Sequence, residues 1–213
     1  MAEIYVSGIR VLENEVNVKT ALTQVDPLRR AQAAQIKDPR KRAQSLAAGL
    51  LVQHAAREYL GENAPAGIYE ILTTEQGKPY FKDFPDLHFS LSHSGQMVLV
   101  ALSEQQVGAD IQEWKELKAD IAGRFFHPEE TAYLRSLPAS SSEKAFFDLW
   151  CLKESYIKYT GKGLSQPLDE LDFTSVLQGG GFAAFEFTED GSRIRAELIE
   201  VPHGYSAAVI ESI

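Results

Sequence analysis

The sequence lacks three features that would have assigned it at once to a class of protein. It has a single cysteine, Cys151, so no disulfide can form within the chain and no cysteine cluster can hold a metal. No stretch approaches the roughly 20 apolar residues that cross a bilayer, and the first residues show no basic segment followed by an apolar run. These absences predict a cytoplasmic protein that is neither secreted nor inserted in a membrane.

Positive charge is also scarce. The chain has 21 Lys and Arg against 30 Asp and Glu, which leaves a net charge of −9. Long-range repulsion from phosphates therefore disfavours a nucleic-acid-binding protein. With 213 residues, of which 44% are hydrophobic and 24% charged, the composition is ordinary for a globular protein of one domain or two small ones.

The first half of the chain predicts strands and helices in similar amount. Short segments rich in β-branched and aromatic residues predict strands, and apolar residues spaced three and four apart predict helices. Two helices are expected at 28–36 and 42–60, the second ended by Gly61. The expected strands are 4–12, 68–73, 80–81, 87–92, 97–102 and 107–112.

The second half shows the same mixture, with an exposed loop expected at 138–142 and Ser142 as the N-cap of the helix after it. Residues 103–106 form either a hairpin or a crossing between two halves. We therefore predict an α+β fold with a possible boundary near 103–106. The remaining expected elements are helices at 118–125, 128–137 and 143–160, and strands at 171–176, 182–188, 193–201 and 204–210.

The strand at 107–112 carries a first candidate site. Side chains alternate along a strand, so Asp110 and Gln112 share one face with Gly108. A carboxylate and an amide oxygen two residues apart suit a hard cation such as Mg²⁺. The alternative, which this segment alone favours, is a half-exposed strand whose polar residues face water.

The helix at 143–160 carries a second candidate. Apolar residues cover more than half of its circumference, so Glu154 lies at the margin of a buried surface. A carboxylate there needs a partner or a metal ion, because removing it from water is unfavourable. The simpler alternative is a surface ion pair with Lys158, four residues later.

Two further features suit an anion. The segment 89–95 ends a strand with Ser92 and His93, whose hydroxyl and imidazole can bind anionic oxygens, although a structural histidine is the commoner case. The segment 29–42 holds six basic residues and one acid, Asp38, and could bind a phosphate or simply be solvated.

In their order and residue identities these features resemble the motifs of the Sfp-type 4′-phosphopantetheinyl transferases over nearly the whole chain. The most specific motifs are Gly-x-Asp-Ile at 108–111 and Trp-x-x-Lys-Glu-x-x-x-Lys at 150–158, which is followed by Gly-Lys-Gly-Leu at 161–164. The other matching segments are Gln-Gly-Lys-Pro at 76–79, His-Phe-Ser-Leu-Ser-His-Ser-Gly at 88–95 and Arg-Phe-Phe at 124–126.

This resemblance implies two pseudo-symmetric α+β halves, 1–104 and 105–213, with the active site in the cleft between them. Coenzyme A and Mg²⁺ would be held there. The enzyme would transfer the 4′-phosphopantetheine group to a serine of an apo acyl or peptidyl carrier protein and release 3′,5′-ADP. The resemblance also implies a monomer, and it leaves open whether the acceptor belongs to fatty acid, polyketide or nonribosomal peptide synthesis.

The resemblance assigns roles to individual residues. Asp110, Gln112 and Glu154 would hold the metal, and Lys158 would offset charge on the phosphates, assisted by Lys153. The base would be Glu154, acting directly or through a metal-bound water, or else Glu130. The residues expected to contact coenzyme A are Lys153, Lys158, Ser92, His93, Gly77, Lys78 and Pro79, with Arg29, Arg30 or Arg42 at its 3′-phosphate.

One position departs from the family pattern. Many members have Glu where this chain has Gln112, which removes one negative charge and predicts weaker binding of Mg²⁺. This departure is the hint for one alternative, a non-catalytic coenzyme A-binding module, and a Mg²⁺-dependent phosphohydrolase is another. Phe125 and Phe126 could grip a carrier helix, although we expect at least one of them to lie in the core.

Overall fold

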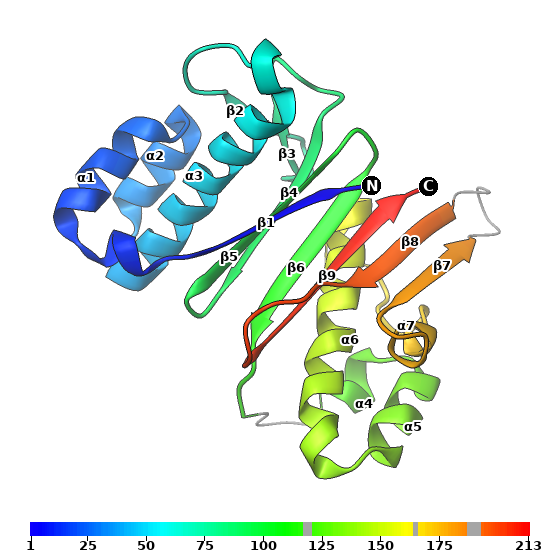
Figure 1. The fold of residues 1–213 in the computed structure, drawn as a ribbon. Coiled ribbons are helices and arrows are strands. Elements are labelled where there is room, and N and C mark those ends of the chain that lie inside the picture. The colour runs from blue at the N-terminus through cyan, green and yellow to red at the C-terminus, as the bar shows by residue number, and fades with distance from the viewer. Residues whose placement is uncertain (117–120, 164–165, 187–192) are drawn as a thin grey trace. The chain divides into compact units, whose positions relative to one another are not determined.

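The computed structural model describes residues 1–116, 121–163, 166–186 and 193–213. The chain divides into two compact units, Met1–Val107 and Gly108–Ile213, each of which contains helices and strands (Figure 1). The α+β prediction is confirmed. The pseudo-symmetry of the halves and the cleft between them stay predictions. In the described residues, no helix is long and apolar enough to cross a membrane.

In the first unit, three helices and a three-stranded antiparallel sheet form the core. The sheet has the order β1-β5-β4, and α3 (Pro39–Leu60) packs on it through Leu46, Val52 and their neighbours (Figure 1). The strands β2 and β3 form a separate hairpin. The remaining elements are β1 (Glu3–Gly8), η1 (Arg10–Glu13), α1 (Glu15–Gln24), α2 (Pro27–Gln35), η2 (Gly61–Asn63), β2 (Ile71–Thr73), β3 (Pro79–Phe81), β4 (His88–Ser94) and β5 (Met97–Ser103).

The second unit is built around one long helix, α6 (Ala139–Thr160), which packs along β9 of a four-stranded sheet in the order β6-β9-β8-β7. Because β5 and β6 belong to different sheets, residues 103–106 are a crossing rather than a hairpin. The other elements are β6 (Val107–Glu113), α4 (Ala122–Phe125), α5 (Pro128–Ser136), α7 (Thr174–Gln178), β7 (Phe182–Glu186), β8 (Arg193–Leu198) and β9 (Tyr205–Ser212).

Several boundaries expected from the sequence are wrong. The strand expected at 68–73 begins only at Ile71, and the one expected at 193–201 ends at Leu198. The opening strand ends at Gly8 rather than at residue 12, because the chain turns into the 3-10 helix η1 and buries Leu12 against the helices. The loop expected at 138–142 is the first turn of α6. The carbonyl of Pro138 accepts the amides of Ser141 and Ser142, so the helix begins three residues before the expected N-cap, Ser142.

A strand expected at 171–176 is also wrong, since α7 begins at Thr174. The amide of Phe173 donates to Glu130 Oε1 at 2.9 Å, and the amide of Thr174 donates to Asp172 Oδ1 at 2.8 Å. These backbone amides thus donate to side-chain carboxylates instead of to the carbonyls of a neighbouring strand. Of the helix expected at 118–125, the structure describes α4, Ala122–Phe125. The start of that helix, at 118–120, and the end of the strand expected at 182–188 lie outside the described residues.

Candidate functional site

The strand β6 and the helix α6 approach each other more closely than any residue but glycine permits. A Cβ atom on Gly108 would lie 2.1 Å from the carbonyl oxygen of Ser155 and 2.3 Å from the amide nitrogen of Tyr159. The Ser155 hydroxyl also donates to the carbonyl of Ala208 on β9 at 3.0 Å. The absence of a side chain at Gly108 therefore lets the last turns of α6 lie directly against β6.

This close approach brings Asp110 and Lys158 together across the two elements. Lys158 Nζ lies 2.7 Å from Asp110 Oδ1 and 3.1 Å from the carbonyl of Ala109. Asp110 is 2% exposed, so the alternative in which it faces water is wrong. Gln112 shares its face as expected, and its Nε2 donates to Asp110 Oδ2 at 2.9 Å.

Glu154 is half-buried and lies near the same carboxylate. Burial raises the pKa of Glu154, the negative charge of Asp110 raises it further, and Lys158 opposes both effects. The part of the chain that the structure describes contains no ion pair between Glu154 and Lys158, because Lys158 pairs with Asp110 instead. The simpler alternative for Glu154 is therefore wrong.

Asp110 and Glu154 offer oxygen ligands to a hard cation, although the described residues contain no group of three His, Cys, Asp or Glu side chains that could hold a metal, and both Asp110 oxygens accept from Lys158 or Gln112. Two carboxylates that repel each other in a half-buried site favour a bound positive charge, and oxygen atoms are the ligands that Mg²⁺ prefers. Asp110 and Glu154 are the residues that would hold it. Gln112 presents its nitrogen to Asp110, so its amide would have to rotate to offer oxygen.

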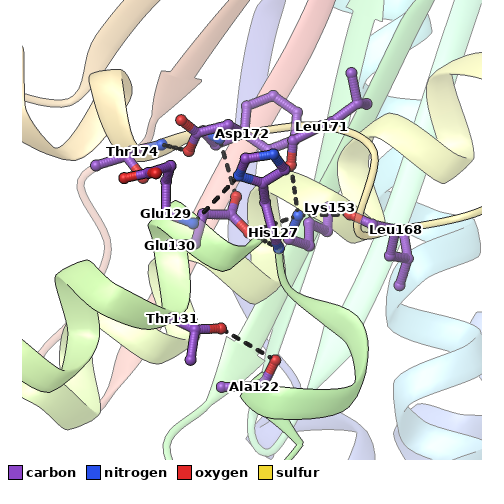
Figure 2. Close-up of polar contacts among 11 residues, drawn as sticks. Ala122, His127, Glu129, Glu130, Thr131, Lys153, Leu168, Leu171, Asp172 and Thr174 are labelled. Atoms are coloured by element: carbon purple, nitrogen blue, oxygen red, sulfur yellow. Dashed lines mark hydrogen bonds and ion pairs between the residues drawn. The ribbon is translucent and has the colours of Figure 1, made fainter.

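Glu130 and Lys153, the other predicted catalytic and coenzyme A-binding groups of this unit, pair with each other (Figure 2). Lys153 Nζ lies 2.7 Å from Glu130 Oε2, and the two side chains are 1% and 0% exposed. Burial raises the pKa of Glu130 and lowers that of Lys153, in both cases against the pull of the partner's charge. Neither residue is bonded to Asp110 or Glu154 in the described contacts.

The first unit holds the three arginines predicted for the 3′-phosphate, and their contacts differ. The Nε atoms of Arg29 and Arg42 are buried and find no hydrogen-bond partner among the described residues. Arg42 also pairs with Glu15, and burial lowers the pKa of Arg29 while Asp26 opposes that shift. The third arginine, Arg30, donates to the carbonyl of Val25 at 3.3 Å.

The predicted turn at 76–79 joins β2 to β3. Gly77 has φ +85°, a conformation that favours glycine, and its amide donates to the carbonyl of Thr74. Lys78 is partly buried, and burial lowers its pKa from 10.5 to about 8. Its Nζ lies 3.5 Å from the carbonyl of Val107. Pro79 begins β3.

Ser92 and His93 both lie on β4, where the alternation of a strand turns them to opposite faces. Ser92 is 6% exposed, whereas His93 is exposed. His93 was expected at the end of the strand 87–92, but it lies within the strand, because β4 continues to Ser94. The two side chains therefore offer one buried hydroxyl and one exposed imidazole.

The sequence is similar to those of known proteins. The profile of the 4′-phosphopantetheinyl transferase superfamily matches residues 106–210. A 4′-phosphopantetheinyl transferase of Bacillus pumilus is 32% identical over 97% of this chain and 88% of its own length. The chain belongs to the Sfp-type 4′-phosphopantetheinyl transferases. The predicted family, and the predicted type of enzyme, are thereby confirmed.

Other relatives agree in family but match over less of their length. The 4′-phosphopantetheinyl transferase Sfp of Bacillus subtilis (strain 168) is 40% identical over 64% of this chain, a match that spans 60% of its own length. A solved holo-(acyl-carrier-protein) synthase of Bacillus anthracis is 17% identical over 47% of this chain, with a TM-score of 0.40. The family assignment rests on the sequence matches.

Two contacts in the second unit were not read from the sequence. The sequence placed Gly108 only on the face of Asp110 and Gln112, whereas in the structure Gly108 admits the backbone of α6. It also did not foresee that the carbonyls of Leu168 and Leu171 accept from Lys153. No sequence signal could have found the carbonyls, because every residue carries one. Gly108 could have been found from its place in a strand, where glycine often marks a close backbone approach.

Proposed function

We propose that this enzyme transfers the 4′-phosphopantetheine group of coenzyme A to a serine hydroxyl of an acyl or peptidyl carrier protein and releases 3′,5′-ADP. The observation that carries the proposal is the group on β6 and α6. A buried carboxylate, Asp110, is paired with Lys158 and lies near Glu154, in a chain of this family. Two carboxylates beside one lysine suit a site that holds a metal-bound pyrophosphate.

In this reaction the serine oxygen forms a bond to the β-phosphorus of coenzyme A, and the bond from that phosphorus to the bridging oxygen breaks. The serine proton goes to a base, and the bridging oxygen leaves with 3′,5′-ADP. Mg²⁺, when bound by Asp110 and Glu154, supplies charge neutralisation for the pyrophosphate. Lys158 stabilises the negative charge that grows on the leaving oxygen.

The contacts favour Glu154 over Glu130 as the base. Glu154 is half-buried, and among the described residues no hydrogen bond or ion pair occupies its carboxylate oxygens. Glu130 already accepts from Lys153, from the amide of Phe173 and from the amide of His127. A carboxylate with both oxygens occupied is poorly placed to take a proton from a substrate.

In the first unit, we assign the 3′-phosphate to Arg29 and Arg42. Each has a buried Nε that lacks a partner among the described residues, and a phosphate oxygen would satisfy it. Arg30 is exposed and donates to the carbonyl of Val25, and it lacks the buried, unsatisfied Nε that Arg29 and Arg42 have among the described residues. We further propose that Lys78, Ser92 and His93 contact coenzyme A, that the turn Gly77-Lys78-Pro79 lies on its adenine side, and that the enzyme acts as a monomer.

The acceptor is a carrier protein, which is typically acidic like this chain, so docking must depend on local contacts. Phe126 is 4% exposed and stacks on Phe146, which confirms that one of the two phenylalanines expected near the carrier lies in the core. Phe125 is partly exposed and lies edge-on to Trp150, with the Arg124 guanidinium over its ring. Phe125 and Arg124 are our candidates for the carrier contact.

The test is a mass measurement. The protein is incubated with coenzyme A, Mg²⁺ and several apo carrier proteins, and the intact carrier mass is followed. We expect a gain of one phosphopantetheine group that is lost in Asp110→Ala and Glu154→Gln. The matched control is Glu143→Gln, an exposed carboxylate on the same helix. If no carrier gains mass although coenzyme A binds, the protein is a coenzyme A-binding module. Phosphate loss without any carrier would indicate a hydrolase.

A further inference from the structure

The ion pair between Glu130 and Lys153 uses every hydrogen-bonding group of the lysine. Lys153 Nζ donates to Glu130 Oε2 at 2.7 Å and to the carbonyls of Leu168 and Leu171 at 2.7 and 2.8 Å (Figure 2). An ammonium group has three N–H donors, so none is left for a phosphate. The group also lies 5.5 Å from the ring centroid of Phe126 and 5.7 Å from that of Phe173.

The carboxylate is equally occupied. Glu130 Oε1 accepts from the amide of Phe173, and Oε2 accepts from the amide of His127 as well as from Lys153. The contact with His127 is half of a capping box, in which the His127 side chain accepts from the amide of Glu129. A single buried carboxylate thereby joins the start of α5, the middle of α6 and the residue before α7.

These contacts act on the helix that carries the reacting groups. Lys153 directly precedes Glu154 on α6, and the adjoining face of the helix is held against β6 by the close approach at Gly108. Two attachments on different sides restrict rotation of α6 about its own axis. Such rotation would move Glu154 and Lys158 away from Asp110.

We propose that Glu130 and Lys153 form a positioning pair, which sets the rotation of α6 so that Glu154 and Lys158 face Asp110. This inference rests on the proposed transferase function. It gives the two residues a role other than base and coenzyme A ligand. A buried ion pair adds little net stability, and losing one partner leaves an unpaired charge, so the pair has to be tested with a double variant.

The variants are Glu130→Gln, Lys153→Met and the two combined. Each single change should lower kcat by about ten- to a hundredfold, because small displacements of reacting groups have effects of this size. The KM for coenzyme A should stay within about twofold, and the Mg²⁺ needed for half activity should rise. The double variant should lose no more than the worse single one, since both changes remove one interaction.

The matched control is Lys144→Met, which removes a lysine of α6 that pairs with Asp148 at 2.6 Å but is 56% exposed. It should leave kcat and the Mg²⁺ requirement unchanged. Three results would overturn the proposal. Additive losses led by Glu130→Gln would make Glu130 the base, and a raised KM in Lys153→Met alone would make Lys153 a ligand. Unchanged kcat per folded molecule in every variant would make the pair merely structural.

A second readout needs no activity. Amide hydrogen exchange of residues 154–158 in the free protein should become faster in Lys153→Met and Glu130→Gln but not in Lys144→Met. If the wild-type protein transfers nothing but the variants show this exchange pattern, the proposed function fails while the role of the pair in fixing α6 is supported. Unchanged exchange in both variants would overturn the positioning role even if transfer is observed.

Discussion

The substitution Gly108→Ala tests whether the approach of α6 to β6 creates the site. The added Cβ would lie 2.1 Å from Ser155 O and 2.3 Å from Tyr159 N, and both of these are backbone atoms of α6. Neither can rotate away as a flexible side chain could. The helix would have to retreat by more than about 1 Å to restore ordinary contact.

Moving α6 away from β6 should lower the stability of the fold, because α6 also packs along β9 and its Ser155 hydroxyl donates to the carbonyl of Ala208 on that strand. Overpacking of a core costs about 1–3 kcal/mol, and contacts this short with backbone place Gly108→Ala at or above the upper end. The same displacement separates Glu154 and Lys158 from Asp110, so we expect kcat to fall about a hundredfold.

The assay is urea unfolding, analysed for a lower midpoint at constant slope, together with kcat per folded molecule. The control is Gly8→Ala, also in a strand, where the added Cβ would meet Gln96 O at an ordinary 3.7 Å. Its stability should stay within about 1 kcal/mol of the wild type. A Gly108→Ala protein with wild-type stability and kcat would refute the reasoning.

Three further predictions concern individual side chains. Gln112→Glu should lower the Mg²⁺ concentration for half activity by restoring a negative charge beside Asp110, and an unchanged or higher requirement in a metal titration would contradict this. Arg29→Met and Arg42→Met should each weaken coenzyme A binding by about tenfold or more in calorimetry, since hydrogen bonds to charged groups are worth about 1.5–3 kcal/mol. Neither substitution should change the affinity for dephospho-coenzyme A, which lacks the 3′-phosphate. Equal losses of affinity for both ligands would argue against a 3′-phosphate contact. Because the pKa of Lys78 is lowered to about 8, its cation is lost as pH rises through that value, so coenzyme A affinity should fall there. Between about pH 8 and 10.5, Lys78 has lost its proton in the folded protein but keeps it in the unfolded chain. The free energy of unfolding should therefore rise with pH over this range in the wild type, compared with Lys78→Met. A binding profile that is the same in the wild type and Lys78→Met would contradict the assignment.

Local patterns in the sequence were enough for most elements and for the family. The spacing of apolar residues placed α3 and most of α6, and strand alternation correctly placed Asp110 and Gln112 on one face. Local reasoning failed where a distant group replaced a local partner. Residues 171–173 have the composition of a strand, but the amide of Phe173 bonds to Glu130, 43 residues away.

The sequence by itself determined which residue types are present and on which face of a strand or helix they lie, because those depend on periods of two and 3.6 residues. Only the tertiary structure decided how they pair. Lys158 bonds to Asp110, 48 residues away, rather than to Glu154 on its own helix. That choice depends on how closely β6 and α6 approach, which Gly108 permits and which no local period encodes.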